Sequence, residues 1–154
     1  MLLIRNPHEL LAAFRPLDLR LFEMPDETSY PIFVRDYRAW IETGGARVYV
    51  VFEDPGSGRP VGIVFRRATT GGAAIVNRMC DWCHYVGSAD EVGMLVAEYS
   101  TRRKLGVMLC RDLRCRERVE EAGDLAGRDT AEARRRVLER IARFAREGLG
   151  LTGT

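Results

Sequence analysis

The chain of 154 residues has one lysine, Lys104, and two histidines, His8 and His84. No apolar run approaches the roughly 20 residues that a membrane-spanning helix needs. The apolar start, Met1–Ile4, ends at Arg5 and is too short for a secretory signal. The sequence also lacks a P-loop, a Gly-x-Gly-x-x-Gly motif and the Ser/His/Asp or paired-carboxylate spacings of catalytic sites. We therefore expect a cytoplasmic protein that is not an enzyme and has neither a membrane partner nor a small-molecule substrate.

The composition is that of a globular domain. Apolar residues make up 46% of the chain and charged residues 30%, a balance that disordered and fibrous proteins do not have. A chain of this length buries roughly 70% of its unfolded surface, which is enough for a core of its own. The 24 basic and 22 acidic residues give a net charge of only +2, so the overall charge does not by itself indicate a nucleic-acid partner.

The apolar pattern predicts an α+β fold with antiparallel β-hairpins. Residues 1–45 form an irregular or helical N-terminal segment, with a helix over 8–15 that ends at Pro16 and a helical turn over 35–43. Residues 46–150 contain runs of β-branched and aromatic residues, which are typical of strands. The predicted strands lie at 47–53, 60–66, 73–78, 92–99 and 105–109, and a helix follows at 111–121.

The C-terminal segment predicts an amphipathic helix. Asp129 and Glu132 have the spacing of a capping box, and Gly148 is a natural end for the helix. Between them an apolar stripe recurs at helical spacing, so one face is expected to pack on the rest of the domain. The stripe consists of Val137, Leu138, Ile141, Phe144 and Ala145.

All four cysteines fall within 36 residues. Two residues separate Cys80 from Cys83, four separate Cys110 from Cys115, and 26 lie between the two pairs. Each pair can supply two sulfur ligands from one turn, so a fold that brings the two turns together completes a tetrahedral site. Thiolates favour zinc over hard cations. A turn, a hairpin and a helix that carries the last ligand form the treble-clef arrangement, so residues 46–150 are predicted to be a treble-clef domain with one Zn²⁺ per chain.

Other roles for the cysteines fit this pattern less well. Free core cysteines would be scattered, disulfides need an oxidising compartment, and a redox Cys-x2-Cys pair starts a helix in a βαβ unit. An iron–sulfur cluster could use the same ligands, but the spacer and the order of elements favour zinc. His84 directly follows Cys83, which makes ligation by both residues awkward. Since four protein thiolates fill every coordination position, we predict a structural metal.

Several segments also carry a resemblance to a known family. They are Met79–Cys83 (MCDWC), Leu109–Cys115 (LCRDLRC), the strand Arg59–Ile63 and the helix Arg136–Arg146. These segments resemble the C-terminal treble-clef zinc-finger domain of elongation-factor-G-binding proteins of the fusidic-acid-resistance type. The resemblance covers about residues 45–147 and does not extend to the helical N-terminal domain of the resistance proteins.

The resemblance implies a zinc-bearing module that binds elongation factor G or the ribosome in translation. RNA binding is an alternative, because residues 101–118 hold seven basic and two acidic side chains, and phosphates attract such a surface. A solvated surface beside an anionic metal centre would account for the same charges. The residues predicted to contact a partner are Arg102, Arg103, Lys104 and Arg114.

Overall fold

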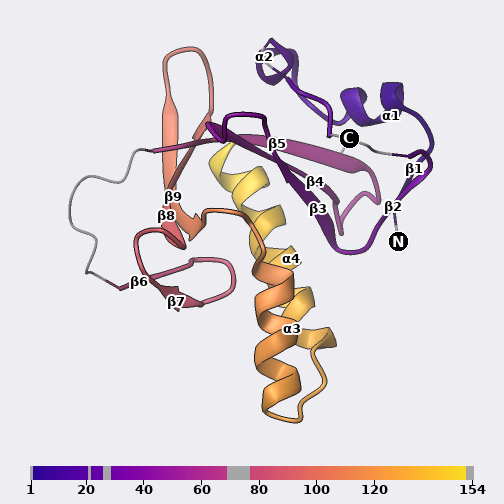
Figure 1. Ribbon diagram of the computed structural model, residues 1–154. Coiled ribbons are helices and arrows are strands. Elements are labelled where there is room, and N and C mark those ends of the chain that lie inside the picture. Colours follow the sequence, from indigo (N-terminus) through magenta and orange to yellow (C-terminus); the bar gives the residue numbers. More distant parts are fainter. Residues whose placement is uncertain (1, 21, 26–28, 69–76, 152–154) are drawn as a thin grey trace.

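The computed structural model describes residues 2–20, 22–25, 29–68 and 77–151. A five-stranded antiparallel sheet of order β3-β4-β5-β8-β9 forms its centre, and β1-β2 and β6-β7 are two-stranded sheets beside it (Figure 1). This architecture confirms the predicted α+β fold. The strands are β1 Leu2–Ile4, β2 Ile32–Val34, β3 Tyr37–Ile41, β4 Arg47–Glu53, β5 Pro60–Arg67, β6 Arg78–Met79, β7 Val86–Gly87, β8 Val92–Glu98 and β9 Lys104–Cys110. The helices are α1 Pro7–Ala12, α2 Pro16–Leu19, α3 Cys115–Leu125 and α4 Ala131–Arg143, which continues as the π-helical turn Phe144–Gly148.

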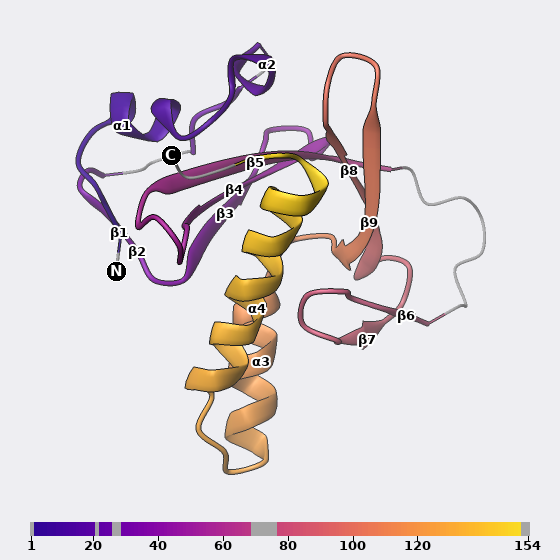
Figure 2. The ribbon, with the colours of Figure 1, turned by 180° about the vertical axis from the view of Figure 1, so that it is seen from behind.

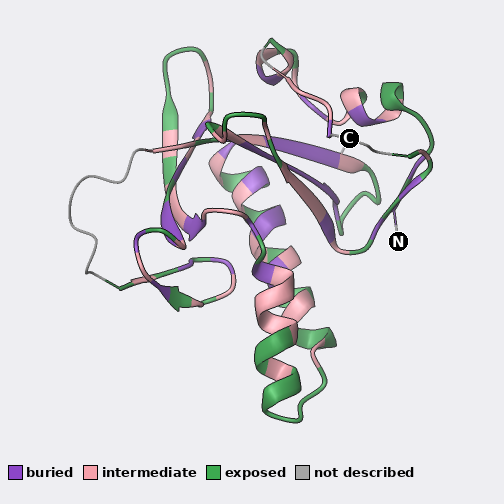
Figure 3. Ribbon diagram, viewed as in Figure 1, coloured by how far each residue is buried: buried purple, intermediate pink, exposed green. Residues whose placement is uncertain are grey.

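The central sheet is covered on both faces where β4 passes through it. Strand β4 is buried at every position from Val48 to Phe52, because successive side chains point to opposite faces and each face packs on another element. One face packs on α4, which lies under the sheet, and the other packs on the N-terminal segment (Figure 2). The free end of the α3–α4 hairpin projects away from this core and is exposed (Figure 3).

The predicted strands agree closely with the structure wherever they are described. The strands predicted at 47–53 and 60–66 are β4 and β5, and those at 92–99 and 105–109 are β8 and β9. The turn between β4 and β5 closes on Asp54, whose Oδ2 accepts hydrogen bonds from the backbone N and the Oγ of Ser57. Most of the strand predicted at 73–78 lies outside the described residues.

The helical turn predicted over 35–43 is wrong, because most of that segment forms strand β3. Asp36 adopts a φ of 67°, which turns the chain between β2 and β3. From Tyr37 onward the segment pairs antiparallel with β4, and Trp40 stacks on Tyr49 at a centroid distance of 5.4 Å. Pairing with a distant strand therefore decides this conformation over local helical propensity. Similarly, the first helix ends at Ala12, and Pro16 begins the short helix α2.

Two other predicted helix starts also differ from the structure. The helix predicted from residue 111 begins at Cys115, because Leu113 has a left-handed φ of 54° that a helix cannot continue through. The last helix begins at Ala131, whose backbone N donates to Asp129 Oδ1 at 3.0 Å, so Asp129 and Glu132 do not form the predicted capping box. Its helical conformation ends at Gly148, as predicted.

The N-terminal segment docks on β5 through a close contact at Gly62. The backbone N of Gly62 donates to the carbonyl of Ala13 at 2.9 Å, and the ring of Phe14 lies directly over the glycine. A Cβ at residue 62 would come within 2.5 Å of that ring. Phe14 also contacts Phe22 and Trp40. The absence of a side chain at Gly62 therefore leaves room for the aromatic cluster that joins the N-terminal segment to the sheet.

Replacing Gly62 by alanine is therefore expected to displace Phe14 and loosen the N-terminal segment. Overpacking of this kind costs about 1–2 kcal/mol of unfolding free energy. Chemical denaturation would measure the loss, and hydrogen exchange of residues 2–14 would locate it. The matched control is Gly44→Ala, because no atom lies within 4 Å of a Cβ built at Gly44. Because Gly44 has a positive φ of 91°, alanine there strains only the turn that contains residue 44. Hydrogen exchange in residues 2–14 should therefore not change. Unchanged exchange in Gly62→Ala would contradict this account.

None of the helices in the described ranges combines the length and the apolar character that crossing a membrane requires.

Candidate metal centre

The four cysteines converge on one point between the β6–β7 hairpin and the start of α3. Their Sγ atoms all lie within 4.8 Å of one another. The Sγ–Sγ distance is 3.7 Å for Cys80 and Cys115 and 3.5 Å for Cys83 and Cys110. A tetrahedron with Zn–S bonds of about 2.3 Å has edges of about 3.8 Å, so these separations fit a shared ion. A disulfide would bring two sulfurs to about 2.05 Å, and all four cysteines are free.

The first pair of ligands comes from the tight turn between β6 and β7. The N–H of His84 donates to the carbonyl of Cys80 at 2.9 Å, and the N–H of Trp82 donates to Cys80 Sγ at 3.4 Å. Asp81 N donates to the carbonyl of Met108 at 2.8 Å, which ties the turn to β9. His84 closes the turn in a left-handed conformation with a φ of 64° and does not belong to the ligand cluster.

The second pair of ligands flanks the turn from β9 into α3. Cys110 ends β9, and Cys115 is the first residue of α3. Between them Leu113 takes the left-handed conformation, and Arg114 N donates to Asp112 Oδ1 at 3.0 Å. Both cysteines are fully buried, so the sulfur atoms of the second turn lie inside the core. This order of turn, hairpin, turn and helix matches the predicted treble clef.

The contacts among the sulfurs require a cation for full ionisation. Hydrogen bonds from Cys110, Cys115 and Cys83 lower the pKa of the Cys80 thiol. Hydrogen bonds to Cys110, Cys80 and Cys83, together with burial, raise the pKa of the Cys115 thiol. Four thiols this close therefore cannot all lose their protons unaided, whereas a divalent ion at their centre stabilises all four thiolates. The donor set suits Zn²⁺, which would cross-link the two turns.

Two arginines that the cysteine pattern does not single out lie beside this centre. The side chain of Arg118 is 18% exposed, donates to both carboxylate oxygens of Asp112 and lies 4.7 Å from the centre of the Tyr85 ring. Its hydrogen bonds to Asp112, and then the negative charge of Cys110 and Cys83, raise the pKa of Arg118. Arg140 of α4 donates to the carbonyl of Trp82 at 2.7 Å. Because Arg118 also neutralises Asp112, these two arginines offset only part of the net charge of −2 that Zn²⁺ and four thiolates would carry.

The side chain of Tyr37, on β3, anchors the second ligand turn through hydrogen bonds to the backbone of that turn. Its buried hydroxyl donates to the carbonyl of Leu113 at 2.5 Å and accepts from the backbone N of Arg116 at 3.0 Å. The guanidinium of Arg116 donates to the carbonyls of Arg35 and Tyr37 and lies 5.1 Å from the Tyr37 ring centre. Sequence reasoning missed this link, because it depends on β3, which was not predicted as a strand.

The structure divides the predicted partner-contacting residues between two places. Arg102, Arg103 and Lys104 lie exposed at the tip of the β8–β9 hairpin, where Arg103 sits 5.8 Å from the centre of the Tyr99 ring. Arg114 lies beyond the other end of β9, beside the cysteines. Seven residues of strand separate the two places by roughly 20 Å. The basic residues of 101–118 therefore do not form one continuous patch.

Comparison with known proteins agrees with this geometry. The solved structure of the fusidic acid resistance protein FusC is similar to this chain with a TM-score of 0.55 and 16% sequence identity. The similarity covers 80% of this chain and 56% of FusC, so the chain spans little more than half of that protein, and at this identity the likeness shows the fold alone. No curated protein matches the sequence. The family described as FBP C-terminal treble-clef zinc-finger matches residues 18–151. The chain therefore belongs to this family, and its four clustered cysteines form a site for one zinc ion.

Proposed function

We propose that the chain is a non-catalytic module that binds elongation factor G in the cytoplasm, through a surface held in shape by its zinc site. The family assignment and the FusC-like fold support a role of this kind. The donor set supports the absence of catalysis at the metal, because four protein thiolates leave no coordination position for water or substrate. The metal then acts by ordering the two ligand turns.

The observation that carries the proposal is an exposed apolar pair next to the first ligand turn. Met79 of β6 and Val86 of β7 stand opposite each other in the antiparallel register, and they are 53% and 55% exposed. Both belong to the short hairpin that the zinc site closes, since Cys80 and Cys83 lie between them. Apolar side chains presented on a rigid turn are suited to the centre of a protein interface, where burial gives most of the affinity.

The test is capture of purified elongation factor G by the zinc-loaded chain after nuclease treatment. The double variant Met79→Glu/Val86→Glu is expected to raise the dissociation constant by at least about tenfold, because two charges would be buried in the interface. Leu125→Glu is the matched control, since Leu125 is 85% exposed at the free end of the helical hairpin. Failure of the zinc-loaded wild type to bind the factor at micromolar concentrations would refute the proposal. Recovery that depends on RNA would favour the RNA-binding alternative instead.

A further inference from the structure

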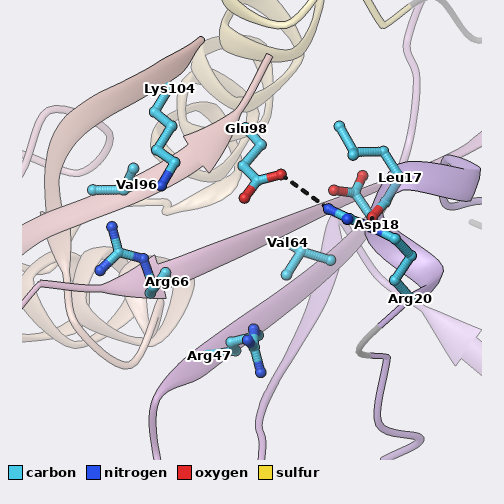
Figure 4. Close-up of a pocket in the computed structure, with 9 residues that line it drawn as sticks. All are labelled: Leu17, Asp18, Arg20, Arg47, Val64, Arg66, Val96, Glu98 and Lys104. Atoms are coloured by element: carbon cyan, nitrogen blue, oxygen red, sulfur yellow. Dashed lines mark hydrogen bonds and ion pairs between the residues drawn. The ribbon is translucent and has the colours of Figure 1, made fainter. Parts of the chain in front are cut away.

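A fork in the central sheet creates a small cavity outside the metal centre. Strands β5 and β8 pair at Arg66 with Val96 and at Arg67 with Leu95, and the ladder ends on the side of Val64 and Glu98. Helix α2 lies at the open side of this fork, where Arg15 donates to the carbonyls of Glu98 and Tyr99. The cavity has a volume of about 80 Å³ (Figure 4). It is lined by Leu17, Asp18, Arg20, Arg47, Val64, Arg66, Val96, Glu98 and Lys104.

The acidic groups in the fork already have cationic partners. Asp18 accepts two hydrogen bonds from Arg15, at 2.9 and 3.2 Å. Glu98 pairs with Arg20 at 3.5 Å, the contact dashed in Figure 4. Asp18 is therefore taken up by Arg15, whereas Glu98, which also stands opposite Lys104 in the β8–β9 register, offsets part of the charge on the strand side.

Only some of the cations on the strand side have an acidic partner at hydrogen-bond distance. Arg47 pairs with Glu42 through one nitrogen at 3.3 Å. Within the described part of the chain, the side chains of Arg66 and Lys104 make no hydrogen bond or ion pair, and both residues are exposed. The four cationic and two acidic side chains of the lining leave a net charge of +2.

The register sets two of these cations side by side. Arg47 and Arg66 are direct partners across the β4–β5 ladder, so their side chains leave the same face of the sheet. Like charges placed directly opposite each other repel. Lys104, on β9, adds a third charge to the same cavity. Glu42 and Glu98 offset part of this charge within the chain, and a bound anion would offset the rest.

We propose that the fork binds a phosphate group, with Arg66 and Lys104 as its direct ligands and Arg47 as the third charge. A guanidinium can donate two parallel hydrogen bonds to phosphate oxygens, and an ammonium adds a compact charge. The net charge of +2 on the lining exceeds what a single carboxylate would neutralise. It matches the doubly charged terminal phosphate of a nucleotide and also attracts the singly charged diester of an RNA backbone. The cavity admits a phosphate group but not a whole nucleotide, so the rest of the ligand stays outside. The phosphate comes either from a free nucleotide or from an RNA backbone. This site is independent of the proposed binding of elongation factor G.

The test is isothermal titration calorimetry of the zinc-loaded full chain with inorganic pyrophosphate, ADP and a single-stranded RNA oligonucleotide. Arg66→Gln and Lys104→Gln are expected to weaken binding by about tenfold each, since each loses one charged hydrogen-bonding partner. The matched control is Arg102→Gln, which removes the same charge from the neighbouring hairpin tip outside the cavity and should change affinity less than about twofold. Arg66→Gln should leave the zinc content unchanged and the thermal midpoint unchanged or higher, because it also removes the repulsion with Arg47.

The three ligands separate the two sources of phosphate. Saturable binding of pyrophosphate or ADP that the fork variants weaken supports a free nucleotide ligand. Binding of RNA alone with the same sensitivity supports a backbone phosphate. The proposal is overturned if no ligand binds saturably at millimolar concentration, or if Arg102→Gln weakens binding as much as the fork variants do.

Discussion

Replacing Cys80 or Cys115 by serine is expected to abolish zinc binding and to unfold the two ligand turns together with β6, β7 and the start of α3. Both cysteines are fully buried, so each variant would place a hydroxyl, a poor zinc ligand, inside the core. A structural zinc site contributes roughly 10–16 kcal/mol on apparent scales. The net stability of a whole domain is only about 5–15 kcal/mol. The stabilisation lost with the ion therefore exceeds the net free energy that holds the domain folded.

Metal analysis and circular dichroism would measure this effect. The matched control is His84→Ser, which changes a residue next to Cys83 that lies outside the sulfur cluster. This variant should keep one zinc per chain and a native spectrum. A native spectrum with one zinc per chain in Cys80→Ser and Cys115→Ser would show that these thiols do not hold the metal.

The parts of the fold that sequence reasoning predicted are those with a local signal. Strands β4 and β5 are runs of β-branched and aromatic residues joined by a turn that closes on Asp54, and all of that information lies within about twenty residues. The cysteine pairs are equally local, because each pair needs only one turn, and the core brings the turns together. The apolar stripe of α4 is also a local pattern, and it packs on the sheet with Val137 and Ile141 buried.

The features that sequence reasoning missed depend on contacts between distant segments. Strand β3 is held by its pairing with β4 and by the stacking of Trp40 on Tyr49, neither of which is visible in its own five residues. The density of basic residues in 101–118 suggested one surface, but the extended β9 carries Lys104 and Arg114 to opposite ends. The opposed pair of Arg47 and Arg66 likewise follows only from the register of the hairpin.

Tyr37→Phe is the second substitution expected to have a large effect, because it removes one hydroxyl that serves two buried backbone groups. Burial raises the pKa of Tyr37 far above its usual range, so the hydroxyl stays protonated and can donate to Leu113. Phenylalanine would leave that carbonyl and the N–H of Arg116 without their partner. Each unsatisfied buried group costs about 1–3 kcal/mol, so the unfolding free energy should fall by roughly 2–6 kcal/mol.

The same substitution should weaken the hold on zinc, because Leu113 and Arg116 flank Cys115 in the second ligand turn. Changes beside metal ligands typically lower metal affinity by about 10–100-fold, and we expect the lower end, since no ligand is removed. Competition with a chromogenic chelator would measure the affinity, and urea denaturation the stability. Tyr99→Phe is the matched control, because Tyr99 is 44% exposed at the hairpin tip. Equal zinc affinity and stability in the two variants would mean that β3 does not support the metal centre.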